Sequence, residues 1–155
     1  MPRRGLDLRV NNAVLATALV VTCGDALSKA WARRELASHP LHVAGQIWLR
    51  LTFNGGVSFS FARWGSLTSL VTLVIALGVL VISMRAAPGV ATAGFGLLIG
   101  GGIANVIDRL AASPHQVTDF IAVGSFPVLN VADASITAGF IVLVVAVLRG
   151  ERILA

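Results

Sequence analysis

The sequence contains little charge. Only 12% of its 155 residues are Asp, Glu, Lys or Arg, and seven of them are acidic, whereas a soluble globular chain carries about 25% charged residues. Apolar residues make up 56% of the chain, and the mean hydropathy is +0.86. This composition excludes an ordinary soluble domain. It predicts a small integral membrane protein with one domain over residues 1–155.

Cysteine is almost absent as well. Cys23 is the only one, so an intramolecular disulfide is excluded. Because Cys23 follows a basic start and an apolar stretch, it also stands where the signal of a bacterial lipoprotein would be cleaved. Such a site prefers a smaller residue than Thr22, and further apolar segments follow. We therefore interpret Cys23 as a small residue packed in a first helix.

Four apolar segments are long enough to cross a bilayer, which takes roughly 20 residues. They lie at about 11–32, 65–84, 88–107 and 129–148, and they predict an all-α membrane protein with four transmembrane helices. Between the first two helices, "GQIWLRLTFNGGVSFSFARW" alternates apolar and polar residues in places. This pattern predicts a small β-hairpin or cradle. Residues 109–128 contain Pro114, Gly124 and Pro127, and we expect them to be irregular.

The basic residues give the orientation. Each side of the predicted topology carries six of them, but the six beside the termini and the turn near Arg85 lie in much shorter loops. This higher density favours cytoplasmic termini and places the two longer loops at the outer, periplasmic side. The basic residues are scattered rather than gathered on one polar face, which argues against a nucleic-acid partner.

The polar residues of interest all fall at the outer ends of the predicted helices or in the outer loops. Ionisable groups at membrane depth are costly, and they usually face the bundle interior and serve a function. Asp25 and Lys29 share one helix face, and so do Asn105 and Arg109. The full set is Asp25, Lys29, Asn54, Asn105, Asp108, Arg109, Asp119, Asn130 and Asp133, with Asp108 noted only as a neighbour of Arg109.

Each of these residues also has a purely structural interpretation. Asp25 and Lys29 can form a neutralising pair. Asn130 can cap the last helix, with Asp133 as an acid in its first turn. Arg109 can extend to the headgroups, and Asn54 before a Gly-Gly pair is typical of a turn. These interpretations explain the individual residues, but they explain poorly why all of them gather at one depth.

A carboxylate pair is the chemistry that this set offers. Asp119 and Asp133 are 14 positions apart, and a connection containing Gly and Pro can bring them together. Two aspartates in a partly dry site do not ionise together easily, so one holds a proton and the other acts as a base towards water. His39 and His42 have no acid or cysteine at ligand spacing, and we expect no metal site.

Five motifs resemble a known family, the bacterial lipoprotein signal peptidases (signal peptidase II). They are "DALSK" (25–29), "NGGVSF" (54–59), "GGGIANVIDR" (100–109), "VTDF" (117–120) and "FPVLNVADASI" (126–136), in the order typical of that family. The resemblance implies four helices with a periplasmic β-cradle. It also implies an inner-membrane aspartic endopeptidase, without metal or other cofactor, that cleaves prolipoproteins just before a cysteine carrying diacylglycerol.

The resemblance also implies roles for individual residues. Asp119 and Asp133 are the expected catalytic dyad, acting at the outer leaflet. We expect a monomer whose partners are lipid-modified prolipoproteins and membrane lipids. The residues expected to position the substrate or brace the dyad are Asp25, Lys29, Asn54, Gly56, Gly101, Asn105, Arg109 and Asn130.

The chain departs from the family pattern at three points. Ala104 stands where the family usually has glycine, and Leu129 replaces the usual phenylalanine before Asn130. The connection between Asp119 and Asp133 is also shorter than is typical of the family. None of these differences removes a predicted catalytic group.

Two other functions agree with the sequence. A small transporter or proton relay would use Asp25, Lys29, Asp119 and Asp133, but a relay is expected to place ionisable groups along its path and near the midplane. A catalytically inactive relative would bind lipidated peptides without cleaving them.

Overall fold

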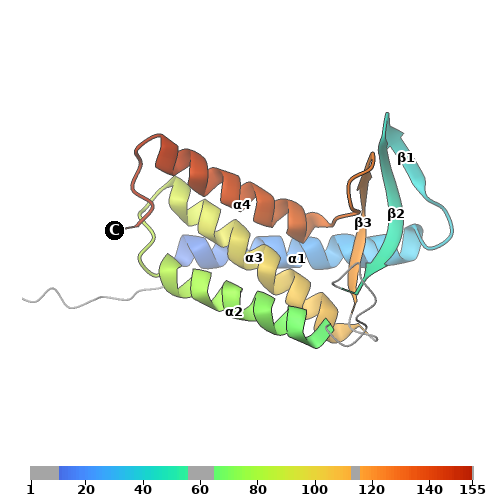
Figure 1. Cartoon of the computed structure of the whole chain (residues 1–155), viewed down its shortest axis with the longest axis horizontal. Coiled ribbons are helices and arrows are strands. Elements are labelled where there is room, and N and C mark those ends of the chain that lie inside the picture. Colours follow the sequence, from blue (N-terminus) through green and yellow to red (C-terminus); the bar gives the residue numbers. More distant parts are fainter. Residues whose placement is uncertain (1–10, 56–64, 113–115, 155) are drawn as a thin grey trace, which may run out of the picture.

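Four helices form a bundle, and a small sheet stands across one end of it (Figure 1). The structure is a computed structural model that describes residues 11–55, 65–112 and 116–154. The elements in order are α1 (Asn12–Glu35), β1 (Leu41–Ala44), β2 (Ile47–Asn54), α2 (Gly65–Ser83), α3 (Val90–Ala111), β3 (Val117–Val123) and α4 (Val131–Leu148). The four predicted helices are present, with ends that differ by up to four residues from those expected.

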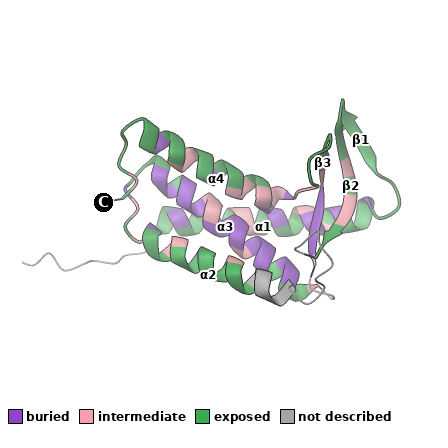
Figure 2. Cartoon of the chain, in the orientation of Figure 1, coloured by how far each residue is buried: buried purple, intermediate pink, exposed green. Residues whose placement is uncertain are grey.

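Helix α3 lies at the centre of the bundle and contacts the other three helices. Figure 2 shows it mostly buried, whereas α2 and α4 are largely exposed. Glycine permits this central position, because a Cβ added at Gly100 would lie 2.7 Å from the carbonyl oxygen of Ala18 in α1. A Cβ added at Gly139 of α4 would lie 2.7 Å from the carbonyl oxygen of Gly94. The helix axes therefore approach more closely than larger residues would allow.

The outer surface of the bundle is apolar and suits a lipid environment. Among the described residues, α1, α3 and α4 are long and apolar enough to cross a membrane, by length and composition, and Leu70–Ser83 of α2 forms a shorter apolar helix. Large side chains such as Leu19 and Leu148 are exposed on this surface. Asp25 and Lys29, by contrast, are each only 1% exposed. A soluble fold would show the opposite arrangement of polar and apolar residues.

A hairpin is present between the first two helices, as predicted, but its first strand precedes residues 45–64, the stretch that suggested it, and residues 56–64 lie outside the described residues. Strands β1 and β2 pair antiparallel, with Leu41 opposite Leu49 and Ala44 opposite Ile47. One face of the sheet is anchored to the end of α1, where Ala32, Leu36 and Phe120 form a small apolar cluster.

The expectation that residues 109–128 are irregular is wrong for Val117–Val123. These residues form β3, which completes the antiparallel order β1-β2-β3 and pairs with β2 from Asn54 opposite Val117 to Ile47 opposite Val123. The strand is "VTDFIAV", rich in the β-branched and aromatic residues that strands favour. The glycine and prolines that suggested a loop lie outside it, and Gly124 turns the chain at its end with φ +55°.

Candidate active site

A short hairpin brings Asp119 and Asp133 to the same place. Asp119 lies in β3 and is 2% exposed, and Asp133 lies in the first turn of α4. After the turn at Gly124, the chain returns beside β3. There Ile121 and Leu129 exchange backbone hydrogen bonds of 2.8 and 2.9 Å. The connection between Asp119 and Asp133 is short because the chain folds back directly beside β3. Leu129 takes part in this fold through its backbone hydrogen bonds with Ile121.

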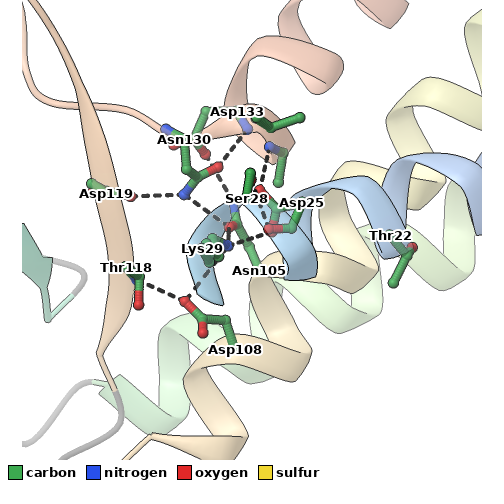
Figure 3. Close-up of polar contacts among 12 residues, drawn as sticks. Thr22, Asp25, Ser28, Lys29, Asn105, Asp108, Thr118, Asp119, Asn130 and Asp133 are labelled. Atoms are coloured by element: carbon green, nitrogen blue, oxygen red, sulfur yellow. Dashed lines mark hydrogen bonds and ion pairs between the residues drawn. The ribbon is translucent and has the colours of Figure 1, made fainter. Parts of the chain in front are cut away.

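Two asparagine side chains link the two aspartates. Asn130 Nδ2 donates to Asp119 Oδ1 at 2.7 Å, and Asn105 Nδ2 donates to Asp133 Oδ1 at 2.8 Å. The two amides also contact each other, since Asn130 Nδ2 lies 3.1 Å from Asn105 Oδ1 (Figure 3). Both aspartates therefore belong to one continuous, largely buried network.

Asn130 caps α4 and also contacts the aspartate pair. Its predicted role as a helix cap is therefore compatible with a role beside the two aspartates. Its Oδ1 accepts the Asp133 N–H at 2.9 Å, and its own N–H donates to Asp133 Oδ2 at 3.2 Å, which completes a capping box. Because its oxygen is occupied in the cap, its amide nitrogen is directed at Asp119. The cap thus determines which end of this amide faces the carboxyl group.

A buried ion pair orients the second amide. Lys29 Nζ lies 2.6 Å from Asp25 Oδ2, as a neutralising pair should, and it donates to Asn105 Oδ1 at 2.8 Å. The oxygen of Asn105 therefore faces Lys29 and its nitrogen faces Asp133. Asp25 also accepts the backbone N–H of Ala132 at 2.8 Å, which fixes the first turn of α4.

Three residues of this region had no predicted role in the site. Asp108 Oδ2 accepts the backbone N–H of Thr118 at 2.7 Å, and Arg33 Nη1 donates to Asp108 Oδ1 at 2.9 Å and to Thr118 Oγ1 at 2.7 Å. Helical spacing indicates two of them. Arg33 follows Lys29 by four residues, and Asp108 follows Asn105 by three, so each lies on the face of its helix that carries the network.

Comparison with known proteins identifies the family. Residues 17–149 match the family model described as Signal peptidase (SPase) II. A lipoprotein signal peptidase of Rhodococcus jostii is 38% identical over 84% of this chain and 70% of its own length. One of Mycolicibacterium smegmatis is 34% identical over 96% of this chain and 64% of its own length. The chain belongs to the signal peptidase II family.

The fold agrees with this assignment. A bacterial membrane enzyme, solved at 2.3 Å resolution by the in meso method, superimposes with a TM-score of 0.76. The superposition covers 89% of this chain and 88% of the other chain, at 22% sequence identity. This signal peptidase II chain therefore keeps the arrangement of helices and sheet of that enzyme although most side chains differ.

Two more predicted residues of this signal peptidase II lie around the same network. A Cβ added at Gly101 would lie 2.5 Å from the carbonyl oxygen of Ala132, so this glycine permits the close approach of α4. Arg109 is 7% exposed, and its charge interacts electrostatically with both Asp119 and Asp133.

One further predicted residue lies at the end of β2. Asn54 is the last residue of β2 and forms a side-chain hydrogen bond with Asp119. Gly56 falls outside the described residues.

The histidines that were weighed as metal ligands make other contacts. The ring of His42 packs on Trp48 with centroids 4.5 Å apart, and its Nε2 lies 2.9 Å from the carbonyl oxygen of Gly45. His39 Nδ1 lies 2.9 Å from Ser38 Oγ. Both histidines are exposed, His42 in β1 and His39 just before it.

Burial sets the electrostatics of Asp119. Loss of solvent is the largest influence and raises the pKa of this carboxyl above its ordinary value of 3.8. Hydrogen bonds from Asn54 and Asn130 oppose the shift, the charge of Asp133 adds to it and that of Lys29 lowers it, and the net direction is upward. A carboxyl group with a raised pKa retains its proton at a pH where a free aspartate has lost it.

Proposed function

We propose that this signal peptidase II removes signal peptides from diacylglyceryl-modified prolipoproteins, cleaving just before the lipidated cysteine, and that Asp119 and Asp133 perform the hydrolysis. One observation carries the assignment of the dyad. The amide bridge of Asn105 and Asn130 joins two aspartates from different elements in a buried site where an apolar bundle meets its sheet. Family membership supports the choice of substrate.

The two aspartates have different surroundings, which supports different roles. Both oxygens of Asp133 accept hydrogen bonds, from Asn105 and from the Asn130 backbone. Asp119 is the more deeply buried acid, and burial raises its pKa. We assign the proton to Asp119 and the negative charge to Asp133.

Hydrolysis then proceeds without a covalent enzyme intermediate. Asp133 takes a proton from water, the water oxygen attacks the scissile carbonyl carbon, and Asp119 gives its proton to the carbonyl oxygen. The tetrahedral intermediate collapses as the C–N bond breaks. The proton held by Asp133 passes to the departing amine, and the proton of the carbonyl oxygen returns to Asp119, so the dyad again carries one proton.

We place the protein in the bacterial inner membrane as a monomer with one domain over residues 1–155, four membrane spans and cytoplasmic termini. The sheet and the dyad then lie at the outer leaflet. Two observations support this arrangement. The described chain ends lie at the end of the bundle opposite the sheet (Figure 1), and the denser basic residues flank those ends. A lipid-anchored substrate would reach Asp119 and Asp133 from the outer leaflet.

The test is cleavage of a diacylglyceryl-modified prolipoprotein by the purified full chain, compared with Asp119→Asn and Asp133→Asn. Both variants should lose at least about a thousandfold in kcat, because each removes a proton-transfer group. Their thermal unfolding should remain cooperative. Full activity in either variant would exclude the dyad, and binding of substrate without cleavage by the wild-type chain would indicate an inactive relative.

A metal chelator provides a second arm of this test. The proposed reaction uses only protein carboxyl groups and water, so a chelator should leave the rate unchanged. Strong inhibition that is reversed by added Zn²⁺ would point to a metalloenzyme instead.

A further inference from the structure

Each aspartate of the proposed dyad follows a residue whose backbone N–H is bound by a buried aspartate. The residue before Asp133 donates its N–H to Asp25 Oδ1 at 2.8 Å. The residue before Asp119 donates its N–H to Asp108 Oδ2 at 2.7 Å. Figure 3 shows Lys29 between the two supporting acids. Asp133 and Asp119 are thus held in the same way, each through a buried aspartate that accepts the N–H of the preceding residue.

A second cation besides Lys29 contacts Asp108, from a side chain that is 42% exposed. Lys29 Nζ lies 2.6 Å from Asp25 Oδ2 and 3.6 Å from Asp108 Oδ2, and the two acids are 1% and 9% exposed. Two buried carboxylates facing one ammonium leave a net negative charge, which is unfavourable in a dry site. Arg33 provides the second cation, with Nη1 2.9 Å from Asp108 Oδ1. These four side chains together are neutral.

Arg33 also reaches the strand that carries Asp119. Its Nη1 donates to Thr118 Oγ1 at 2.7 Å, and Thr118 is 1% exposed. Thr118 is therefore bound twice, through its hydroxyl by Arg33 and through its N–H by Asp108. Strand β3 is the last strand of the described sheet, so a backbone donor on its outer edge needs a partner from elsewhere in the fold.

We propose that Arg33 and Asp108 form a clamp on Thr118 that positions Asp119 for the reaction. Neither Arg33 nor Asp108 touches the reacting groups, so both are positioning residues that act through Thr118. The clamp joins the ends of α1 and α3 to β3, so the three elements meet at one point. This inference rests on the proposed function only in requiring that Asp119 belongs to the dyad.

The first test separates catalysis from binding. Arg33→Met removes both contacts of the guanidinium and keeps a good helix former. A displacement of about 1 Å in a reacting group can reduce the rate about a hundredfold, so we expect kcat to fall about 10- to 100-fold with KM changed by less than about twofold. Arg34→Met is the matched control. Arg34 is the next residue and is exposed, and the variant removes the same positive charge as Arg33→Met. Its kinetics should stay those of the wild type.

A different kinetic result would overturn the clamp. If Arg33→Met raises KM and leaves kcat unchanged, then Arg33 binds the substrate or its lipid. If Arg34→Met is equally slow, the effect comes from the charge of the helix end and not from Thr118.

Thr118 provides the second test. Thr118→Val removes the hydroxyl group and keeps the branched shape, whereas Thr118→Ser keeps the hydroxyl group. We expect Thr118→Val to lower kcat in the manner of Arg33→Met and Thr118→Ser to retain most of the wild-type rate. The double variant Arg33→Met/Thr118→Val should be no slower than Arg33→Met alone, within about twofold. The reason is that each single variant already removes the same hydrogen bond between Arg33 and Thr118. Fully multiplicative losses contradict a shared role.

Hydrogen exchange tests the clamp without any turnover. Arg33→Met should speed amide exchange in residues 117–120 and leave exchange in residues 131–139 of α4 unchanged. Unchanged exchange in residues 117–120 overturns the clamp even if Asp119→Asn is inactive. Faster exchange in residues 117–120 combined with full activity of Asp119→Asn would give a different outcome. It would show that Arg33 does hold Thr118, but that Asp119 is not catalytic and that Arg33 therefore has no positioning role.

Discussion

The two halves of the α1–α3 interface are built in different ways. In the half remote from the sheet, Val14 and Ala18 pack on Phe95 and Ile99, and a Cβ at Gly96 would lie 2.9 Å from the carbonyl oxygen of Val14. In the half beside the sheet, the same two helices meet through Asp25, Lys29, Asn105 and Asp108. One pair of helices therefore combines a close-packed apolar contact with a buried charged one.

The difference shows how the site is oriented. Apolar packing has no preferred direction, so the first half sets only the distance between the helices. Hydrogen bonds and ion pairs have direction. The second half therefore determines where Asn105 points, and through it where Asp133 is held. Close packing holds the bundle together, and the charged half fixes the direction of the side chains around Asp133.

Removing the cation at the centre of the charged half should have the largest effect. Lys29→Met leaves Asp25 and Asp108 buried without their shared partner, and breaking a buried pair in this way destabilises by about 3–5 kcal/mol. We expect a large fall in Tm in detergent solution, together with loss of cleavage. A Tm that differs from the wild type by less than 1 °C would show that the charged half does not stabilise the fold.

A matched double variant tests whether the loss of stability comes from the unpaired buried carboxylates. Asp25→Asn keeps an oxygen for the Ala132 N–H but removes one negative charge. Lys29→Met/Asp25→Asn should therefore recover part of the Tm that Lys29→Met loses. A further drop in the double variant would indicate that the two side chains stabilise the bundle independently.

Overpacking the apolar half should have the next largest effect. In Gly100→Ala the new Cβ would lie 2.7 Å from the Ala18 carbonyl oxygen, so one helix must shift, at about 1–3 kcal/mol. Gly102→Ala is the control, because its Cβ would meet only the Ala76 Cβ at 3.4 Å. Thermal unfolding should show a lower Tm for Gly100→Ala and an unchanged or higher Tm for Gly102→Ala. Equal shifts in the two variants would contradict the close approach.

The sequence alone predicted the helices and most residues of the buried polar network, for physical reasons. Long apolar runs are a strong indication of helices in a membrane protein. Polar residues in such runs are rare enough that Asp25, Lys29, Asn105 and Asn130 stood out, and the structure brings all four into one network. The Asp25–Lys29 pair within one helix followed from the spacing, but the contacts between different helices could not be predicted, because they depend on how far each helix is rotated.

Strand β3 and the clamp were missed for a related reason. Glycine and proline at both ends of residues 117–123 suggested a loop, and only pairing with β2 makes this stretch a strand. Arg33 and Asp108 were given no role in the site, because their shared partner Thr118 is 85 and 10 residues away in sequence. Contacts between distant segments are set by the tertiary fold, which local patterns do not encode.

Gly101→Ala should disturb the site more than the bundle. Its Cβ would lie 2.5 Å from the Ala132 carbonyl oxygen and 2.7 Å from Ile136 Cγ1, so the first turn of α4 must move and carry Asp133 with it. We expect kcat to fall about tenfold, equivalent to about 1.4 kcal/mol, with KM nearly unchanged. Gly102→Ala serves again as the neighbouring control. Wild-type kcat in Gly101→Ala would show that α4 moves freely without affecting Asp133.

The smallest expected effect concerns the pH dependence of stability. The pKa of Asp119 is raised by burial above its ordinary value of 3.8, so its contribution to stability is fully present below that value and is lost as the pH rises through the raised pKa. Asp119→Asn stays neutral at every pH and avoids this loss. Its Tm should exceed that of the wild type at neutral pH, and the gap should close as the pH falls towards 3.8. Because all other titrating groups are common to both proteins, a gap that widened on acidification would mean that the folded protein favours the charged form of Asp119, and the proton would then have to be assigned to Asp133.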